Sequence, residues 1–122
     1  IIHSGWKGTQ QNISEKMIRS IHKEHMIFDL DFFIGPCIRR QNYEIGKDVS
    51  IYFESLYPDS LTKKGDKFLF ANDFVVKEQL ARLSTGYVPD DPGVCNFEVP
   101  EYYSHRRKDL GRNLNIIWMT NH

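Results

Sequence analysis

Residues 3–9 have the sequence His3-Ser4-Gly5-Trp6-Lys7-Gly8-Thr9, and the pattern of the chain changes across this segment. Two β-branched residues, Ile1 and Ile2, precede it and predict the end of a strand. Its two glycines predict a tight connection. Beyond Gln10 the apolar residues recur at helical spacing, which predicts an amphipathic helix with Thr9 as its N-cap. The inward positions of this helix are Ile13, Met17, Ile18 and Ile21.

The remainder of the chain alternates between short apolar runs and helical patterns. Residues 30–34 are rich in aromatics and end at Gly35-Pro36, which predicts a buried strand. Further strands are expected at residues 67–71 and 115–119. Further helices are expected from Gly46 to Leu56 and from Phe74 to Leu83, with Gly86 as the C-terminal stop. Their inward positions are Val49, Tyr52, Phe53 and Leu56, then Phe74, Val75, Leu80 and Leu83. This alternation predicts an α+β fold in which mixed β-sheets are flanked by helices.

Length and charge restrict the class of protein. A chain of 122 residues is one domain at most. Sixteen basic residues balance sixteen acidic ones, which argues against a nucleic-acid or membrane partner. Two cysteines, Cys37 and Cys95, are too few for a disulfide framework and favour the reducing cytoplasm. The sequence starts without Met and in the middle of a pattern, so we expect a fragment.

Three clusters of residues could do chemistry. In the first, His3 could bind a metal or transfer a proton near neutral pH, or could simply bond a neighbouring carbonyl. In the second, Glu44 could be a functional carboxylate or an acid favoured near a helix N-terminus. In the third, residues 102–112 combine tyrosines and arginines, which suits a flat ring and an anion but also a solvated basic edge. Cys37 and Cys95 are expected to be buried structural thiols.

These clusters, in this order and at these separations, resemble the C-terminal half of the YfiH-like laccase-domain family. The family's His-Ala-Gly-Trp-Arg-Gly-Thr segment matches residues 3–9, with Ser4 in place of alanine and Lys7 in place of arginine. Its Gly-Pro-x-Ile and Phe-Glu-Val-Gly stretches match residues 35–38 and 43–46. Its Cys-Thr, Phe-Phe-Ser-x-Arg-Arg and Gly-Arg stretches match residues 95–96, 102–107 and 111–112.

The resemblance implies a YfiH-like fold, related to that of the deamidating-toxin cysteine hydrolases. Residues 1–122 would be the C-terminal part of a single domain whose N-terminal half lies outside this sequence. The family holds one transition metal, zinc or alternatively copper, between two histidines and a cysteine. His3 inherits one ligand position, and the other two ligands would lie upstream. Three protein ligands with an open fourth position are typical of catalytic zinc. This chain by itself is expected to bind metal poorly.

The activity that the resemblance implies is zinc-dependent and acts on purine nucleosides. It comprises phosphorolysis of adenosine, inosine or methylthioadenosine, and hydrolytic deamination of adenosine, in the cytoplasm. Phosphorolysis needs phosphate held by cations, and deamination needs a nucleophilic water. The expected catalytic residues are His3, Glu44 and Arg106. The expected substrate-binding residues are Lys7, Arg107, Arg112 and Tyr103 or its neighbour Tyr102.

Three other functions stay open. The family's older label is multicopper polyphenol oxidase, although this chain has five histidines and no His-x-His pair. The related fold suggests a cysteine hydrolase, or an enzyme that edits peptidoglycan precursors. A truncated, non-catalytic binding domain is the third alternative. The oligomeric state does not follow from the sequence.

Overall fold

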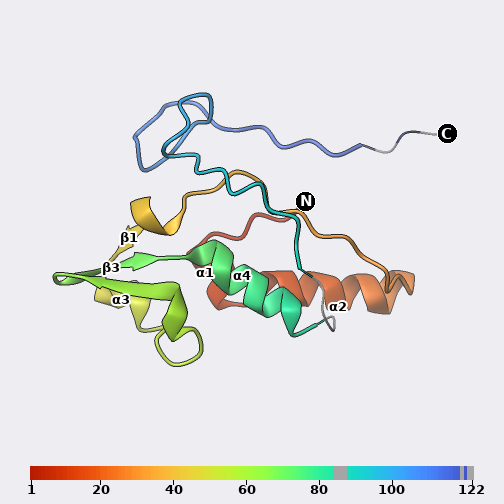
Figure 1. Ribbon diagram of the computed structural model, residues 1–122. Helices are drawn as coiled ribbons and strands as arrows, with labels where there is room; N and C mark the ends of the chain where they lie inside the picture. The colour runs from red at the N-terminus through yellow and green to blue at the C-terminus, as the bar shows by residue number, and fades with distance from the viewer. Residues whose placement is uncertain (84–87, 119, 121–122) are drawn as a thin grey trace.

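The computed structural model describes residues 1–83, 88–118 and 120. The elements in chain order are α1 (Trp6–Gln10), α2 (Ile13–His25), η1 (Arg40–Asn42), β1 (Glu44–Ile45), α3 (Lys47–Ser50), η2 (Pro58–Ser60), β2 (Leu61–Lys64), β3 (Lys67–Phe70) and α4 (Asn72–Ala81). In Figure 1 the small sheet lies at one end of the molecule with α1, α2 and α4 beside it. The chain after α4 forms an irregular loop above them and then an extended tail. The α+β class is confirmed.

The sheet has three strands in the order β1-β3-β2, and both pairings are antiparallel. β2 and β3 form a hairpin in which Lys64 pairs with Lys67, so that two residues make the turn. Gly65 takes a φ of 62° in this turn, a conformation that glycine adopts without steric cost. The strand expected at residues 67–71 is confirmed as β3. β2 was not expected, because the run Leu61-Thr62-Lys63-Lys64 has little apolar character.

The hydrophobic core is built mainly from aromatic rings. Phe70 of β3 is completely buried, and its ring centroid lies 4.5 Å from that of Phe53 and 5.5 Å from that of Tyr43. Val75 of α4 joins the same cluster, and Trp6 of α1 packs against it. Burying a side chain of this size contributes about 1.5–3 kcal/mol. This cluster therefore holds the sheet, α3, α4 and the start of the chain together.

Helix α4 fixes the position of the first segment through two side-chain amides. Asn72 donates a hydrogen bond from Nδ2 to the carbonyl oxygen of Ser4 at 2.7 Å. Gln79 donates from Nε2 to the carbonyl oxygen of Thr9 at 2.8 Å, and both of these residues are buried. The expected inward positions Val75 and Leu80 of this helix are confirmed. Gly86, its expected stop, lies outside the described residues.

Several expectations for the first segment were wrong. No strand forms at residues 1–3, and residues 6–10 of the expected connection are the helix α1. Thr9 does not cap α2, because it lies inside α1 and its hydroxyl pairs with that of Ser4 at 2.9 Å. Asn12 occupies the N-cap position of α2 instead, with a φ of 55°. In α2 Ile18 is buried as expected, whereas Met17 is exposed.

Two expected strands and most of one expected helix are also absent from the described chain. Residues 30–34 make only an isolated parallel bridge, between Phe33 and Asp90. Residues 115–118 are extended and pair with no described strand, and Met119 lies outside the described residues. α3 ends at Ser50, and turns carry the chain on to Leu56, which is exposed together with Tyr52. An apolar run becomes a strand only when another strand satisfies its backbone groups.

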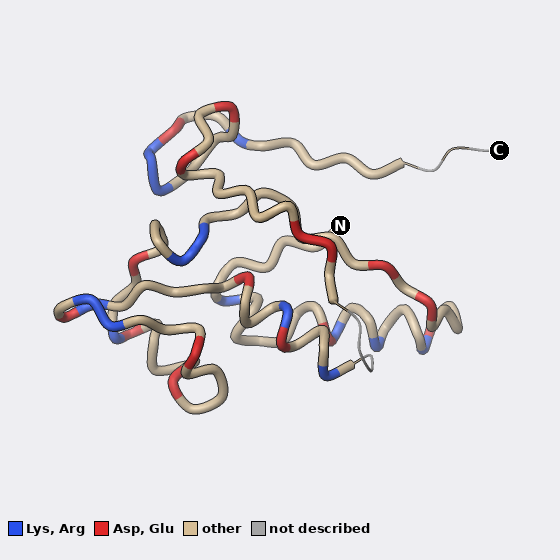
Figure 2. The backbone as a smooth tube through the Cα atoms, viewed as in Figure 1, with Lys and Arg blue, Asp and Glu red and all other residues tan. Residues whose placement is uncertain are grey.

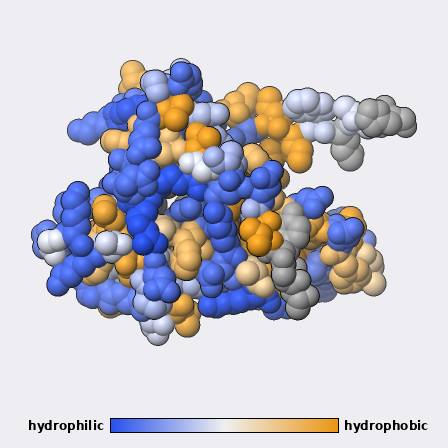
Figure 3. All heavy atoms as spheres, in the orientation of Figure 1, coloured by the Kyte–Doolittle hydropathy of each residue, from blue (hydrophilic) through white to orange (hydrophobic). Residues whose placement is uncertain are grey.

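The tail exposes large apolar side chains. Figure 3 shows hydrophobic residues gathered along it. The large apolar side chains exposed there are Leu114, Ile116, Ile117 and Trp118. Singly exposed apolar residues are ordinary, but a contiguous set of this kind is typical of a surface that contacts another polypeptide. Among the described helices, none has the length and apolar character that crossing a membrane requires.

Candidate functional site

His3 lies at the surface, beside the start of α1. Its imidazole stands next to Gly5: a Cβ atom on that glycine would lie only 3.2 Å from His3 Nε2. A second glycine, Gly8, lies near the His3 backbone, where a Cβ would be 3.6 Å from the His3 carbonyl oxygen. Gly5 therefore lets the imidazole lie close to the backbone, whereas a side chain at Gly8 would be in ordinary contact with His3. The two hydrogen bonds from α4 hold the same turn, so His3 projects from a fixed backbone.

Lys7 lies beside the aromatic ring of its neighbour Trp6. Its ammonium nitrogen is 5.5 Å from the centroid of the Trp6 ring, and that ring stacks with Tyr52 at 6.2 Å. A cation over an indole ring at this distance is a favourable contact at an exposed site. Lys7 is exposed, so its charge is open to an anion from solution.

Glu44 lies on the sheet and forms ion pairs with two lysines of the hairpin. Its carboxylate oxygens are 3.2 Å from Lys64 Nζ and 3.0 Å from Lys67 Nζ. Hydrogen bonds from Lys67 and then Lys64 hold the pKa of Glu44 below its ordinary value. A carboxylate kept ionised in this way is suited to bind a cation or to position a group, and less suited to donate a proton.

Arg106 brings the third cluster to the core. Its guanidinium carbon lies 5.2 Å from the ring centroid of the buried Tyr43. Burial raises the pKa of the Tyr43 hydroxyl, and the nearby Arg106 charge opposes that shift. Arg106 is exposed, and among the described residues no carboxylate or carbonyl takes a hydrogen bond from it. Its donors are therefore free to bind an anion.

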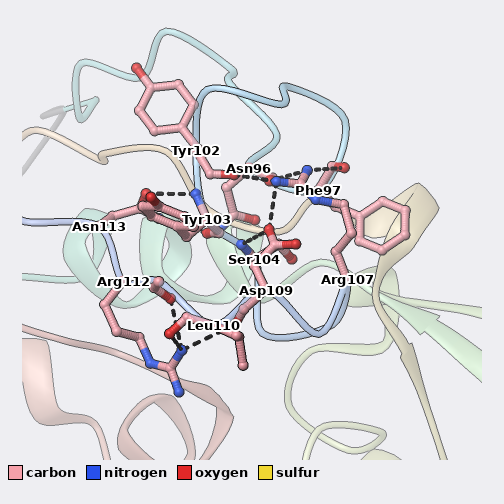
Figure 4. Close-up of polar contacts among 11 residues, drawn as sticks. Asn96, Phe97, Tyr102, Tyr103, Ser104, Arg107, Asp109, Leu110, Arg112 and Asn113 are labelled. Atoms are coloured by element: carbon pink, nitrogen blue, oxygen red, sulfur yellow. Dashed lines mark hydrogen bonds and ion pairs between the residues drawn. The ribbon is translucent and has the colours of Figure 1, made fainter.

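We call residues 94–112 the C-terminal loop. The guanidinium groups of Arg107 and Arg112 donate their hydrogen bonds to acceptors within this loop (Figure 4). Arg107 donates to the carbonyl oxygens of Phe97 and Tyr102 and forms an ion pair with Asp109 at 2.7 Å. Arg112 donates to the carbonyl oxygen of Gly111 at 2.8 Å. Basic and acidic residues both occur in this region (Figure 2), and the Arg107 charge is balanced by Asp109 of the same loop.

Residues of the C-terminal loop line a shallow hollow of about 690 Å³ that is open to solvent. Its lining combines Tyr103 and Arg107 with Phe97, Glu98, Pro100, Asp109, Leu110 and Gly111. The Tyr103 ring packs so closely on Gly111 that any side chain at that position would collide with it. Figure 4 shows Tyr103 and Arg107 on the same loop, with Ser104 and Asp109 between them. A mostly apolar hollow with an aromatic ring and a cation is typical of a small-molecule site.

A buried ion network was missed from the sequence. Arg39 forms ion pairs with Asp91 at 2.6 Å and with Asp73 at 2.8 Å, and Lys77 also contacts Asp91 at 2.6 Å. Arg39 holds the pKa of Asp91 far below its ordinary value, with Lys77 and the Gly93 amide adding to the effect. A second cavity, of about 390 Å³, lies against Arg39, Asp73 and Lys77. The Asp91-Pro92-Gly93 turn was the available signal, since an Asp two residues before a glycine often accepts that glycine's amide hydrogen.

The described residues do not by themselves make a metal site. Among residues 1–83, 88–118 and 120, no group of three His, Cys, Asp or Glu side chains is placed to hold a metal ion. His3 supplies one imidazole, whereas a catalytic zinc takes three protein ligands. Among the described residues, the set of metal ligands around His3 is therefore incomplete.

The structure brings only some of the expected site residues together. Tyr103 and Arg107 line one hollow, whereas Arg106, the next residue to Arg107 in the chain, does not line it and contacts the Tyr43 ring instead. Arg106 contacts the ring of Tyr43, the residue that directly precedes Glu44. Across the described chain, no hydrogen bond or ion pair joins His3 to the C-terminal loop.

Three curated proteins that are similar to this chain share one name. A purine nucleoside phosphorylase of Xylella fastidiosa is 25% identical over 98% of this chain and 48% of its own length. Proteins of the same name from Campylobacter jejuni and Staphylococcus epidermidis are each 26% identical, over 97% and 96% of this chain. The chain spans about half the length of these relatives.

A solved structure, the hypothetical protein YfiH of Bacillus licheniformis, matches 86% of this chain and 43% of its own. The TM-score is 0.75 at 23% identity, which shows that the two share a fold. A sequence model of the family described as multi-copper polyphenol oxidoreductase laccase matches residues 1–120. Because that match covers nearly the whole chain, the protein belongs to this laccase-domain family, of which YfiH is a structural representative.

Proposed function

We propose that the protein acts in the cytoplasm on purine nucleosides, as a phosphorylase and as an adenosine deaminase. The observation that carries the proposal is that relatives from three bacterial species bear the name purine nucleoside phosphorylase and align with 96–98% of the chain. The aromatic side chains that line the hollow in the C-terminal loop, Phe97 and Tyr103, support it, because a nucleoside offers a flat base that can stack on such rings. The proposed substrates are adenosine, inosine and methylthioadenosine, together with phosphate.

The roles follow from the surroundings of each residue. Arg106 binds phosphate, because its exposed guanidinium group has no hydrogen-bond acceptor or ion-pair partner among the described residues. Tyr103, with Tyr102 next to it, stacks on the base. Arg107 shapes the hollow from its wall, Arg112 and Lys7 add positive charge at the surface, and Glu44 positions a group near Tyr43. In phosphorolysis a phosphate oxygen attacks the anomeric carbon of the sugar, and the purine leaves with the bonding electron pair and takes up a proton.

The intact enzyme needs a second half of the domain. The relatives are about twice as long as this chain, and the exposed apolar residues of the tail offer a surface for the remainder of such a domain. We propose that His3 is one ligand of a zinc ion whose two further ligands, a histidine and a cysteine, come from that half. Zinc would supply a polarised water for deamination. This chain alone is expected to be inactive.

The test is a set of parallel assays on the protein at its full native length. Each nucleoside is incubated with and without phosphate, and free base, sugar 1-phosphate, inosine and ammonia are separated by chromatography. Phosphate-dependent release of base is the expected result. Absence of both base and ammonia from all three nucleosides, in a folded and metal-loaded sample, would contradict the proposal. Oxygen uptake with a phenolic substrate would favour the oxidase that the family description names.

Arg106→Ala should raise the apparent phosphate KM of the intact enzyme by about 10–100-fold, because a charge-assisted hydrogen bond of about 1.5–3 kcal/mol is lost. The matched control is Lys63→Ala, which removes an exposed cation from the hairpin turn region. Steady-state kinetics at varied phosphate give the comparison. An unchanged phosphate KM in Arg106→Ala would remove Arg106 from the anion site.

A further inference from the structure

The two cysteines of the chain lie directly opposite each other on neighbouring segments. Cys37 and Cys95 form an isolated parallel bridge. The Cys37 amide donates to the carbonyl oxygen of Val94 at 3.3 Å, and the Asn96 amide donates to that of Cys37 at 3.1 Å. Both thiols are free. The purine-nucleoside function proposed above uses neither of them.

This register places the two thiols within reach of a covalent bond. Paired strands run about 4.7–4.9 Å apart, and opposed residues of a parallel pair project to the same face. A disulfide needs Cα atoms about 4.4–6.8 Å apart. Backbone hydrogen bonds on both sides of Cys37 hold the pair in this register, so no large movement of the chain is needed to join them.

We propose that Cys37 and Cys95 are a reversible redox pair that forms an intramolecular disulfide with a low-molecular-weight disulfide as the oxidant. Such bonds in a reducing compartment are commonly transient and redox-sensing. The bond would tie the segment after Gly35-Pro36 to the first residues of the C-terminal loop.

The surroundings of the two sulfurs give them different roles. Cys37 is partly exposed, whereas Cys95 is buried at 4% exposure. Burial raises the pKa of Cys37 to about 11, although the Arg39 charge opposes the shift. Burial also acts on Cys95, but hydrogen bonds to its sulfur from the Arg39 amide and the Asn42 side chain outweigh it, and its pKa is lowered. Cys37 therefore meets the oxidant, and Cys95 resolves the intermediate.

The reaction balances in two exchange steps. Cys37 loses its proton and attacks one sulfur of oxidised glutathione, so the S–S bond of the oxidant breaks and one glutathione thiolate leaves. The Cys95 thiolate then attacks the Cys37 sulfur of the mixed disulfide and expels the second glutathione thiolate. The two cysteines lose two electrons and two protons, and oxidised glutathione becomes two thiols.

Oxidation would act on the hollow of the C-terminal loop. Arg107, which lines that hollow, donates hydrogen bonds to the carbonyl oxygens of Asn96 and Phe97. Asn96 directly follows Cys95 in the chain. A covalent bond at Cys95 restrains the chain that carries these two carbonyls. The bond also closes a loop of more than 50 residues, which restricts the unfolded chain.

The experiment exposes the native, purified protein to a series of oxidised and reduced glutathione mixtures and maps its peptides without reduction by mass spectrometry. The expected result is a peptide pair cross-linked through Cys37 and Cys95, reversed by reduced glutathione. Its formation should accelerate about tenfold per pH unit between pH 7 and pH 9, because only the rare Cys37 thiolate reacts. The oxidised protein should melt at least about 5 °C higher than the reduced one.

Single variants separate this pair from ordinary thiol chemistry. Cys95→Ser should accumulate a glutathione adduct on Cys37, because nothing resolves it, whereas Cys37→Ser should react with glutathione only after unfolding. Three results would overturn the proposal in the wild-type protein, whichever variants fold. They are a stable glutathione adduct on Cys37, a cross-link between two chains at low protein concentration, and loss of thiols only in denaturant.

Discussion

The aromatic core and the C-terminal loop are held together by different forces. In the core, Phe53, Phe70 and Val75 are almost completely removed from solvent, and the rings of Phe53 and Phe70 pack against each other. In the C-terminal loop, residues 94–112, only Cys95 and Ser104 are buried, and backbone hydrogen bonds together with arginine-to-carbonyl hydrogen bonds hold the chain. The core is therefore a rigid support, while the loop that carries the candidate site can open locally without unfolding the remainder.

The largest effect is expected from emptying the core. Phe70→Ala should lower the free energy of unfolding by about 3–5 kcal/mol, because it removes a completely buried ring and leaves a cavity. The matched control is Leu110→Ala in the C-terminal loop, whose side chain is 99% exposed and should contribute less than about 0.5 kcal/mol. Urea unfolding of both variants tests the comparison. Equal losses would mean that the two regions do not differ as described.

The next effect concerns the ion network of Arg39, Asp73, Lys77 and Asp91. Asp91→Asn should cost about 2–3 kcal/mol at pH 7, because Arg39 and Lys77 lose a nearly buried carboxylate partner. Because the pKa of Asp91 is lowered in the folded protein, its stabilisation is complete above its unfolded pKa and is lost as the pH falls below about 4. Wild type should therefore lose its advantage over Asp91→Asn in acid. Unfolding midpoints measured from pH 7 down to pH 2 would show the two curves converging, whereas parallel curves would contradict the role of Asp91.

A smaller and local effect is expected in the C-terminal loop. Arg107→Ala removes the guanidinium that holds the carbonyls of Phe97 and Tyr102. Amide hydrogen exchange in residues 96–109 should accelerate by about tenfold, while exchange in the hairpin of β2 and β3 should not change. Arg112→Ala is the control, because Arg112 contacts only carbonyls within three residues of itself. Faster exchange throughout the protein would show that the loop and the core unfold together.

The smallest effect is expected at the surface of the sheet. Glu44→Gln removes the partner of Lys64 and Lys67, but all three side chains are well exposed to solvent, which screens such pairs. Thermal unfolding at physiological salt should be indistinguishable from wild type. A drop of several degrees would show that Glu44 supports the fold of the sheet, and any loss of activity in this variant could then not be assigned to chemistry.

The sequence predicted the parts of the fold that depend on local pattern. The helices α2 and α4 and the strand β3 appear where the apolar spacing indicated, because one side of each packs against the core. The pattern failed where a partner decides the outcome: residues 30–34 and 115–118 have strand-like composition but find only one bridge or none among the described residues.

The candidate site divides in the same way. Sequence alone identified the three clusters, their order and their resemblance to the laccase-domain family, because residue type and spacing carry that information. It did not distinguish Arg106, which donates no hydrogen bond among the described residues, from Arg107, which donates its hydrogen bonds to carbonyls of its own loop. It also gave no hint that Cys37 and Cys95 oppose each other across 58 positions, or that Arg39 is buried with two aspartates. Those facts depend on contacts between distant segments, and only the tertiary structure decides which charges are paired, which are exposed and which thiols meet.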